Sequence, residues 1–493
     1  MPVLLRVCEY DLADTIGMQS EMNVRSDDYA EMPQLAAGAH IHVVGIGGSG
    51  MSAIARVLLE RGGYRVSGSD RSLSPAGQAL AELGATVYDG HRAAQIGGAD
   101  VVVVSSAVPA DNVEVRAARA AGIPVVRRPE LLGWLTQGHE TIAVAGTAGK
   151  TTTTAIIAQL LQAAGLDPSF VIGGMLPGNG SNAHAGRGAH FVIEADEYDR
   201  TFLALKPRIA VVTNVEWDHP DCYPTYADVQ AAFAAFVAGL RPGGSLVACG
   251  DDPGACALAV GRPAGSRWLS YGVGERCDVR AAGVVRRGMG HDLDLVVAGE
   301  CLGRLTLRVP GLHNVRNALA ACAVAHALGI PIGATRRALA DYRGVARRFE
   351  LIGEVAGVTV IDDYAHHPTK IRATLAAARE CFPGHTIWAV FQPHTFSRTE
   401  ALLADYRRSF ADADHVLITP IYAARERDND RVSSADLVRD ADHEDMRCVS
   451  DLRSATEVLV RNLKAGDVLV TMGAGDSYRV GEGVLSLLRE RVK

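Results

Sequence analysis

The stretch TIAVAGTAGKTTTTAIIAQLLQAAG, residues 141–165, combines a short apolar strand, a glycine-rich loop and a helix. Thr141–Ala145 reads as a buried strand and Gly146–Lys150 as the loop, while Thr151–Ala164 is helical until Gly165 ends it. Backbone N–H groups at the start of a helix point at an anion, and the helix dipole favours negative charge. The order of strand, loop and helix therefore predicts a phosphate-binding loop.

The side chains of this loop are those that a nucleoside triphosphate requires. We expect Lys150 to reach the β- and γ-phosphates and the Thr151 hydroxyl to bind Mg²⁺. The chain has only five lysines among its 49 basic residues, and Lys150 suits a site where a planar guanidinium cannot replace a compact ammonium. The loop is shorter than the general pattern GxxxxGK[ST], so the alternative is a glycine-rich turn with an exposed lysine.

A second glycine-rich loop, GIGGSG at residues 45–50, follows the apolar strand His40–Gly45 and opens the helical stretch Met51–Arg61. Asp70 follows 25 residues after Gly45. Such a loop binds a diphosphate attached to a ribose, which suits a UDP-sugar as well as NAD. A lone GxGxxG is weak evidence, and tight packing of strand against helix without a ligand is the alternative.

Apolar strands alternate with helical stretches along the whole chain, which is typical of parallel α/β sheets. Short alternating β patterns fill residues 250–309. The predicted fold class is α/β, with three domains and a central unit of the P-loop type. The expected segments are a poorly ordered N-terminal extension followed by the three domains, at residues 1–38, 39–135, 136–345 and 346–493.

Acidic residues follow two strands that we expect to be neighbours. EADEYD (194–199) follows Phe191–Ile193, and NVEWDH (214–219) follows Ile209–Thr213. Carboxylates at the carboxyl ends of parallel strands lie in the crevice where ligands bind, and their oxygens suit hard cations such as Mg²⁺. A solvated acidic loop is the alternative. His219 is a candidate metal ligand, directly or through water, although a lone histidine usually is not one.

The composition of the 493 residues excludes several classes of protein. The net charge of −7 has no blocks of like charge, which argues against a nucleic-acid partner. Nine scattered cysteines without a CxxC pair indicate reduced thiols, as in the cytoplasm. No apolar run reaches transmembrane length, and the N-terminus lacks a signal-peptide pattern. We therefore expect a cytoplasmic protein without a membrane span.

Nine motifs follow one another in a fixed order. They are GIGGSGM (45–51), GTAGKTTTT (146–154), EADEYD (194–199), NVEWDHPD (214–221), GLHNVRNALAA (311–321), RRFE (347–350), DDYAHHPT (362–369), FQPHTFSRT (391–399) and MGAGD (472–476). Together they resemble the full motif set of the Mur ligases, over roughly residues 40–480. As a set these motifs are highly specific.

The resemblance implies an ATP-dependent acid–amino-acid ligase of peptidoglycan precursor synthesis. The N-terminal and C-terminal domains would be Rossmann-like and would hold UDP-N-acetylmuramate and the amino acid, with ATP and Mg²⁺, at two metal sites, in the central domain. Within the family the motifs are most similar to those of the type that joins L-alanine to the lactyl carboxylate of UDP-N-acetylmuramate. That reaction passes through an acyl phosphate and releases ADP and phosphate.

The resemblance also implies roles for individual residues. For ATP these are Gly146, Thr147, Ala148, Gly149, Lys150, Thr151, Thr152, Asn314, Asn317, Arg348 and Asp363. For the UDP-sugar they are Gly45, Gly47, Gly48, Ser49, Gly50, Met51, Asp70, Ser106 and Asn182. The expected catalytic residues are Lys150, Glu194, His219, His367 and Arg398, and the expected metal ligands are Thr151, Glu194 and His219. L-alanine would meet Tyr364, His394 and Arg398, with the Arg398 guanidinium on its α-carboxylate.

The sequence departs from the family pattern at two positions. Ala148 stands where His or Asn is usual, and Lys370 stands where an acidic residue is common. Some relatives bridge metal ions with a carbamylated lysine, but here no lysine lies between Lys206 and Lys370. A carbamylated lysine that bridges metal ions is therefore not expected after His219.

Three alternatives stay open on the sequence. A nicotinamide-dependent oxidoreductase could use the loop 45–50 but would leave the loop 146–152 idle. A non-enzymatic module could bind ATP without releasing phosphate. A murein tripeptide-recycling ligase of the same family shares EADEYD, whereas FQPHTFSRT favours free alanine. Neither the oligomeric state nor the general base follows from the sequence.

Overall fold

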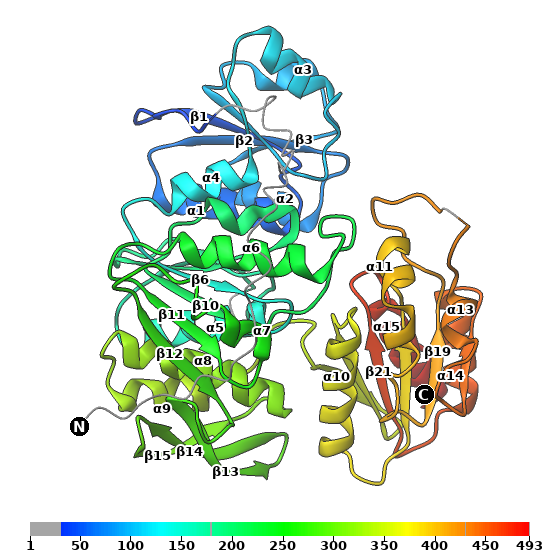
Figure 1. Cartoon of the computed structure of the whole chain (residues 1–493). Helices are drawn as coiled ribbons and strands as arrows, with labels where there is room; N and C mark the ends of the chain where they lie inside the picture. Colours follow the sequence, from blue (N-terminus) through cyan, green and yellow to red (C-terminus); the bar gives the residue numbers. More distant parts are fainter. Residues whose placement is uncertain (1–30, 178–179, 429, 493) are drawn as a thin grey trace.

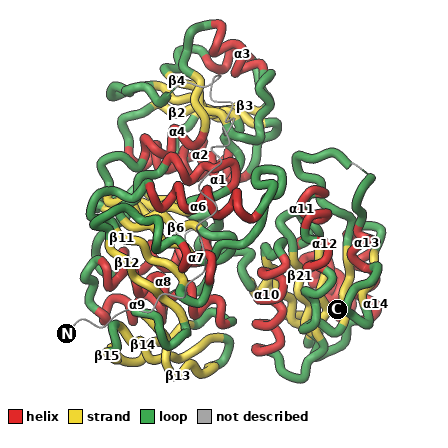
Figure 2. The backbone as a smooth tube through the Cα atoms, viewed as in Figure 1, coloured by secondary structure: helices red, strands yellow, loops and turns green. Residues whose placement is uncertain are grey.

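The structure of the protein, a computed structural model, describes residues 31–177, 180–428 and 430–492. Three α/β domains follow one another along the chain (Figures 1 and 2). Most of the expected extension, residues 1–38, lies outside the described residues, and residues 31–38 contain no helix or strand. In the described part of the chain no helix is both long and apolar enough to cross a membrane.

The first domain has a parallel five-stranded sheet in the order β3-β2-β1-β4-β5. Its strands are β1 (His40–Val44), β2 (Arg65–Asp70), β3 (Thr86–Asp89), β4 (Val101–Val104) and β5 (Val125–Arg127). Its helices are α1 (Ser49–Arg61), α2 (Pro75–Glu82), the 3₁₀ helix η1 (Ala93–Ile96), α3 (Val113–Ala120) and α4 (Arg128–Leu135). The strand order reverses beside β1, so the loop after β1 lies at the switch point where such sheets bind ligands.

The central domain has a ten-stranded sheet in the order β15-β14-β13-β12-β11-β10-β6-β9-β7-β8. Its strands are β6 (Glu140–Ala145), β7 (Ser169–Val171), β8 (Ala183–His184), β9 (His190–Glu194), β10 (Ile209–Val212), β11 (Ser245–Cys249), β12 (Arg267–Gly272), β13 (Val279–Arg287), β14 (Gly290–Val297) and β15 (Glu300–Leu307). Its helices are α5 (Lys150–Ala163), the 3₁₀ helix η2 (Tyr198–Ala204), α6 (Tyr226–Ala238), α7 (Pro253–Ala257), α8 (Leu312–Ala327) and α9 (Ile332–Asp341). The strands β6, β9 and β10 are parallel neighbours, so the phosphate loop and both acidic motifs leave the same edge of the sheet.

The third domain has a six-stranded sheet in the order β16-β17-β21-β18-β19-β20, in which only β16 is antiparallel to its neighbour. Its strands are β16 (Glu350–Val355), β17 (Val358–Asp363), β18 (Ile387–Phe391), β19 (His415–Ile418), β20 (Met446–Cys448) and β21 (Val468–Met472). Its helices are α10 (Pro368–Cys381), α11 (Phe396–Ala401), α12 (Leu403–Tyr406), α13 (Ser434–Val438), α14 (Leu452–Asn462) and α15 (Tyr478–Val492). The predicted α/β class is confirmed.

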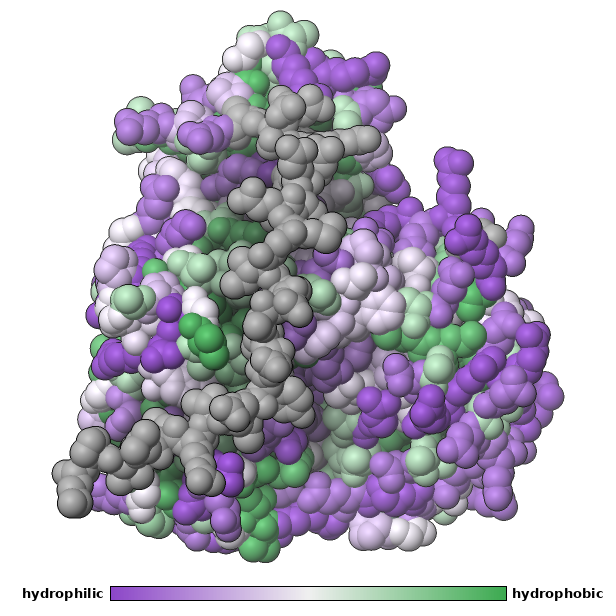
Figure 3. All heavy atoms as spheres, in the orientation of Figure 1, coloured by the Kyte–Doolittle hydropathy of each residue, from purple (hydrophilic) through white to green (hydrophobic). Residues whose placement is uncertain are grey.

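The first two domains share an apolar core, whereas the third domain has its own. One continuous cluster of buried residues runs through the first two domains, whereas two separate clusters fill the two faces of the third sheet. Trp217 packs against both the shared cluster and a cluster of the third domain. Hydrophilic side chains cover most of the visible face of the third domain (Figure 3). The third domain therefore has its own core, and Trp217 of the central domain packs against it.

Candidate active site

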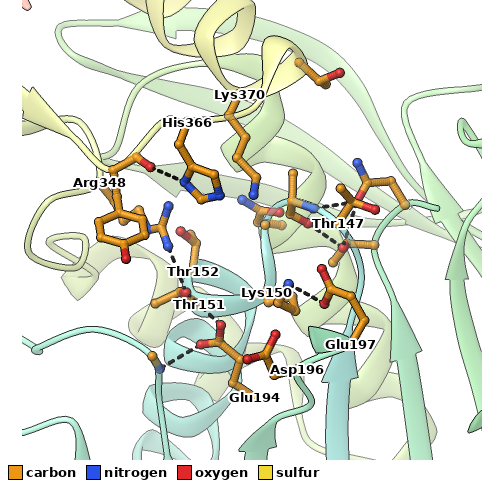
Figure 4. Close-up of a pocket in the computed structure, with 18 of the residues that line it drawn as sticks. Thr147, Lys150, Thr151, Thr152, Glu194, Asp196, Glu197, Arg348, His366 and Lys370 are labelled. Carbon is orange, nitrogen blue, oxygen red and sulfur yellow. Dashed lines mark hydrogen bonds and ion pairs between the residues drawn. The ribbon is translucent and has the colours of Figure 1, made fainter. Parts of the chain in front are cut away.

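A cavity of about 650 Å³ lies where the three domains meet. The phosphate loop and the first acidic motif of the central domain line it (Figure 4), and so does the second acidic motif. Ser49 and Gly50 reach it from the first domain, and Tyr364, His394 and Arg398 reach it from the third. Residues expected to act on three different ligands therefore share one space.

Two glycines allow the loop after β6 to pass close to its neighbours. Gly146 has a φ of 141°, and a Cβ there would collide with the Thr213 hydroxyl. Gly149 has a φ of 82°, and its Cβ would lie 2.5 Å from Asn317 Oδ1. Both positions need glycine for space and for conformation. The loop is thereby fixed against the end of β10 and against α8.

Lys150 is held in place from two sides. Its ammonium donates to the Gly146 carbonyl at 2.8 Å and pairs with Glu197 Oε2 at 2.6 Å. Burial acts to lower the Lys150 pKa, but the Glu197 and Asp196 carboxylates outweigh it and the pKa is raised. Lys150 therefore stays charged beside the cavity. Glu197 was not among the predicted site residues.

Thr151 and Glu194 are already in contact. The Thr151 hydroxyl donates to Glu194 Oε1 at 3.1 Å and accepts from Arg348 Nη2 of the third domain at 3.1 Å. The other Glu194 oxygen accepts from the Gly173 amide at 2.7 Å. A hydroxyl next to a carboxylate is the pairing that a hard cation beside phosphates uses.

His219 lies against two carboxylate oxygens that lack hydrogen bonds. Glu197 Oε1 and Asp218 Oδ2 are buried without a partner among the described residues, and each lies 3.8 Å from His219 Nε2. Burial lowers the His219 pKa, which keeps the imidazole neutral and able to bind a metal. No group of three such side chains forms a complete metal site in the described ranges. These residues fit a divalent cation only if water or phosphate oxygens complete its coordination.

Arg398 is more enclosed than its expected role suggests. The side chain is 5% exposed, and its Nε donates to Asp218 Oδ1 at 2.6 Å. Its terminal nitrogens face His394 Nδ1 and His219 Nδ1, each at 3.2 Å. Asp218 thus holds the guanidinium from the central domain, and only its terminal nitrogens face the cavity wall. Sequence reasoning quoted Asp218 within a motif but gave it no role.

The two neighbouring histidines before α10 have different positions. His367, the predicted catalytic residue, caps α10 through the Thr369 amide and contacts the Trp217 carbonyl at 3.2 Å. It is not among the residues that line the cavity, whereas His366 is. Burial keeps the pKa of His366 well below its ordinary value, so its imidazole is neutral.

Asp363 and Tyr364 of the third domain lie near Arg348, a residue expected to bind the nucleotide. Asp363 Oδ2 accepts from the Phe349 amide at 2.7 Å, and burial raises its pKa to about 6. The guanidinium groups of Arg347 and Arg348 are each centred 5.0 Å from the centroid of the Tyr364 ring. Tyr364 therefore adjoins nucleotide-side residues as well as the expected amino-acid site.

The asparagines expected near the base form a buried chain. Asn317 Nδ2 donates to Asn314 Oδ1 at 3.0 Å, and Asn314 Nδ2 donates to the Pro310 carbonyl at 2.7 Å. Thr153 of α5 donates to Asn317 Oδ1 at 3.2 Å. The chain ties the start of α8 to the phosphate loop.

Asp70, at the end of β2, holds the loop that follows β1. The Gly47 amide donates to Asp70 Oδ2 at 2.8 Å, and the Arg71 amide donates to Asp70 Oδ1 at 2.7 Å. Both carboxylate oxygens are thus used inside the protein, so Asp70 supports the loop itself. Asn182 of the central domain donates to the Ser49 carbonyl at 3.3 Å and links the two domains.

Other residues expected to bind the UDP-sugar lie apart from the shared cavity. Met51 is 2% exposed within the core. Ser106 lines a second cavity of about 180 Å³, together with Arg127 and Arg128. Arg128 also lines the large cavity and lies against Gly50, so it connects the two spaces. The sequence offered no signal for Arg128.

This arrangement of three α/β domains around one phosphate loop defines an ATP-dependent ligase. Three family domains match the chain in order. They are "Mur ligase family, catalytic domain" at residues 40–140, "Mur ligase middle domain" at residues 144–325 and "Mur ligase, glutamate ligase domain" at residues 347–475. The chain belongs to the Mur ligase family.

Relatives and solved structures agree with this assignment. UDP-N-acetylmuramate–L-alanine ligases from Roseiflexus sp. (strain RS-1) and Salinibacter ruber are 47% and 45% identical, each over 92% of this chain and over 100% and 96% of their own lengths. The structure of UDP-N-acetylmuramate–alanine ligase from Thermotoga maritima matches with a TM-score of 0.76 and 28% identity, over 92% of this chain and 99% of that one. A murein peptide ligase from Psychrobacter arcticus matches with a TM-score of 0.71 and 27% identity, over the same shares.

The substitution Ala148→His is expected to change the KM for ATP by no more than about tenfold, because one added side-chain contact is worth about 0.5–1.5 kcal/mol at most. The Ala148 amide donates to Asn214 Oδ1 at 2.8 Å, which fixes the loop without a side chain at residue 148. Phosphate-release kinetics with ATP as the varied substrate measure the effect, with Ala148→Ser as the control. A large rise in kcat would show that the missing side chain limits catalysis.

Proposed function

We propose that this ligase joins L-alanine to the lactyl carboxylate of UDP-N-acetylmuramate and converts ATP to ADP and phosphate, as a step of peptidoglycan precursor synthesis. The observation that carries the proposal is the single cavity in which the phosphate loop faces Ser49 and Gly50 of the first domain and His394 and Arg398 of the third. The names and the 43–47% identity of the full-length relatives support the choice of substrates.

The reaction requires an activated carboxylate, because a free carboxylate is a poor electrophile. Its oxygen attacks the γ-phosphorus of ATP, and ADP leaves from the other side, which gives an acyl phosphate. The alanine nitrogen then attacks the acyl carbon, the C–O bond to phosphate breaks and an amide forms. Phosphoryl transfer depends mainly on positioning and on neutralising charge.

The protein supplies that charge neutralisation from the loop. Lys150 would leave Glu197 partly or wholly to meet the β- and γ-phosphates, and the first amides of α5 would hold phosphate oxygens. Mg²⁺, when bound, shields the phosphate charges and orients them. Thr151 and Glu194 would hold one ion, and His219 with the unpaired oxygen of Glu197 would hold a second.

The third domain would bind the amino acid and exclude water from the reaction. Arg398 would bind the α-carboxylate of alanine through its terminal nitrogens, while Asp218 fixes its Nε. The ammonium must lose a proton before it attacks, and the buried imidazoles of His366 and His394 have pKa values below the ordinary range, so both are neutral acceptors. Closure of this domain would protect the acyl phosphate from hydrolysis.

The Tyr364 ring is expected to select a small side chain, since it offers a large surface beside His366, at 5.5 Å between ring centroids. Alanine should be preferred to glycine by about 1–3 kcal/mol, because a pocket gains little from one methyl, and serine should be accepted for the same reason. Valine should be excluded. Kinetics with alanine, glycine, serine and valine measure this selection, and valine should gain activity in Tyr364→Ala but not in Tyr226→Ala, which changes an exposed tyrosine of α6. Continued exclusion of valine by Tyr364→Ala would remove Tyr364 from the pocket.

The function itself is tested by phosphate release with UDP-N-acetylmuramate, ATP and a panel of amino acids. Release that depends on all three substrates, with alanine the preferred amino acid, is the expected result. Preference for the murein tripeptide would move the chain to the recycling type within the family. ATP binding without any phosphate release would indicate a binding module, and binding of NAD at the first loop, detected by fluorescence, would favour an oxidoreductase.

A further inference from the structure

Lys370 reaches into the shared cavity from the third domain. It lies in the first turn of α10, and its side chain extends toward the phosphate loop (Figure 4). The side chain is half-buried, and its ammonium makes no hydrogen bond or ion pair with any residue in the described ranges. A half-buried ammonium without a partner is costly, so its position needs a reason.

The carboxylates nearest to Lys370 already have other partners. Asp218, in the segment that follows β10, pairs with Arg398 at 2.6 Å, and Glu197 pairs with Lys150 at 2.6 Å. Each carboxylate is therefore neutralised by a cation that is closer to it. Lys370 is left as a surplus positive charge at this wall of the cavity.

Two cations also act on Lys370. Lys150 from α5 and Arg348 from the segment before β16 line the same cavity, and both disfavour the charged form of Lys370. The two histidines beside it, His366 and His367, are kept neutral, with burial as the main cause. Burial, together with these two cations, lowers the Lys370 pKa to about 8 although Asp218 opposes the shift.

Lys150, Arg348 and Lys370 converge on one wall of the cavity, and the Lys370 ammonium has no carboxylate partner among the described residues, so this wall suits a highly charged anion. We propose that Lys370 binds the terminal phosphoryl group of ATP, opposite Lys150, and follows that group as it moves to the substrate carboxylate. The proposal rests on the proposed function, since it takes ATP to lie on the loop at 146–152. The third domain would then contact the transferred phosphoryl group directly, through Lys370.

The backbone around Lys370 is fixed well enough for this task. Thr369 donates to Glu216 Oε2 of the central domain at 2.5 Å, and the neighbouring His367 contacts the Trp217 carbonyl at 3.2 Å. Both contacts cross from the third domain to the central domain beside the loop. Closure of the third domain would therefore place the ammonium at a defined point above the phosphates.

The first test compares ATP with ADP, because only ATP carries the group that Lys370 is proposed to hold. In Lys370→Met the affinity for the β,γ-methylene analogue of ATP should fall about 10- to 100-fold, the range expected for loss of a charged hydrogen bond. The affinity for ADP should change less than about twofold. Lys370→Arg should recover part of the loss, and Lys464→Met, an exposed lysine of the same domain, should change neither affinity. Thermal unfolding checks that each variant is folded.

The second test measures protons. A Lys370 ammonium with a pKa of about 8 is half deprotonated at pH 8 in the free enzyme, and an adjacent phosphate raises that pKa. Binding of the ATP analogue at pH 8 should therefore take up about half a proton more than binding of ADP. Calorimetry in buffers of different ionisation enthalpy measures this difference, which should vanish in Lys370→Met.

The outcomes separate the proposal from its alternatives. Equal losses of affinity for the ATP analogue and for ADP in Lys370→Met would overturn the proposal. Unchanged affinities with a reduced kcat would also overturn it, because Lys370 would then act as the acceptor of the alanine proton. Failure of the wild-type enzyme to bind either nucleotide would overturn the proposed function and the Lys370 assignment together. Loss of the ATP preference in the variant, with alanine-dependent phosphate release intact in the wild type, supports both.

Discussion

The Lys150→Arg variant is expected to fold normally and to lose about 100- to 1,000-fold in kcat, the usual loss when one preorganised hydrogen-bond donor no longer reaches the transition state. The ammonium lies within 2.8 Å of Gly146 O and 2.6 Å of Glu197 Oε2. A planar guanidinium is wider than this space and cannot reach phosphate oxygens from the same point. The measurement is phosphate release at saturating substrates.

Arginine is the informative substitution because it keeps the charge. Lys150→Met would leave the Glu197 carboxylate, 3% exposed, without its partner, at a cost of about 3–5 kcal/mol in stability. Loss of activity in that variant could then reflect unfolding. Lys206→Arg, at an exposed position, is the matched control and should retain full activity. Near-normal turnover in a folded Lys150→Arg enzyme would contradict the assigned role.

Strands were predictable where they are buried on both faces. Val101–Val104 and Val468–Met472 consist almost entirely of apolar residues and are buried along their whole length, which gives a continuous run in the sequence. The strands β7 and β20 have three residues each, too few to show any period, and only their pairing with neighbours defines them. The sequence therefore predicts the centre of each sheet and misses its short outer strands.

Site residues were predictable where the local chain carries the chemistry. The loop at 146–152 is recognisable because its strand, glycines and lysine are consecutive. The ion pairs Lys150–Glu197 and Arg398–Asp218 join residues 47 and 180 positions apart, and nothing in the spacing indicates either partner. The sequence also does not show which of His366 and His367 lines the cavity. That depends on which of the two adjacent side chains caps α10, and in the structure it is His367.

The buried pair between Arg398 and Asp218 joins the two domains that must come together for catalysis. Asp218 lies in the segment that follows β10, whereas Arg398 lies on α11. Burial alone would raise the Asp218 pKa, but the Arg398 guanidinium holds it well below its ordinary range. A carboxyl with a depressed pKa adds stability above its unfolded pKa and loses it only as the pH falls through the folded value. The pair therefore persists at neutral and mildly acidic pH.

Arg398→Lys is expected to lower kcat/KM for alanine by about 100-fold or more, since a charged, doubly hydrogen-bonded group is worth about 1.5–3 kcal/mol and its alignment adds to this. A lysine has one charged centre, so it can meet Asp218 or the substrate carboxylate but cannot span both. The terminal nitrogens that now face His394 and His219 would be lost as well. The affinity for ATP should change by less than about threefold, because Arg398 makes no contact with the loop at 146–152 among the described residues.

The control for Arg398→Lys is Arg439→Lys in the same domain. Arg439 pairs with Asp436 at 3.0 Å, but its side chain is 66% exposed, and exposed pairs contribute about 0–1 kcal/mol. Steady-state kinetics with alanine, and then with ATP, as the varied substrate distinguish a local loss of amino-acid binding from a general loss of closure. A rise in KM for alanine alone is the expected pattern, because the guanidinium meets only that substrate. Equal losses for both substrates would instead make the Arg398–Asp218 pair a domain latch, and unchanged kinetics would remove Arg398 from the alanine site.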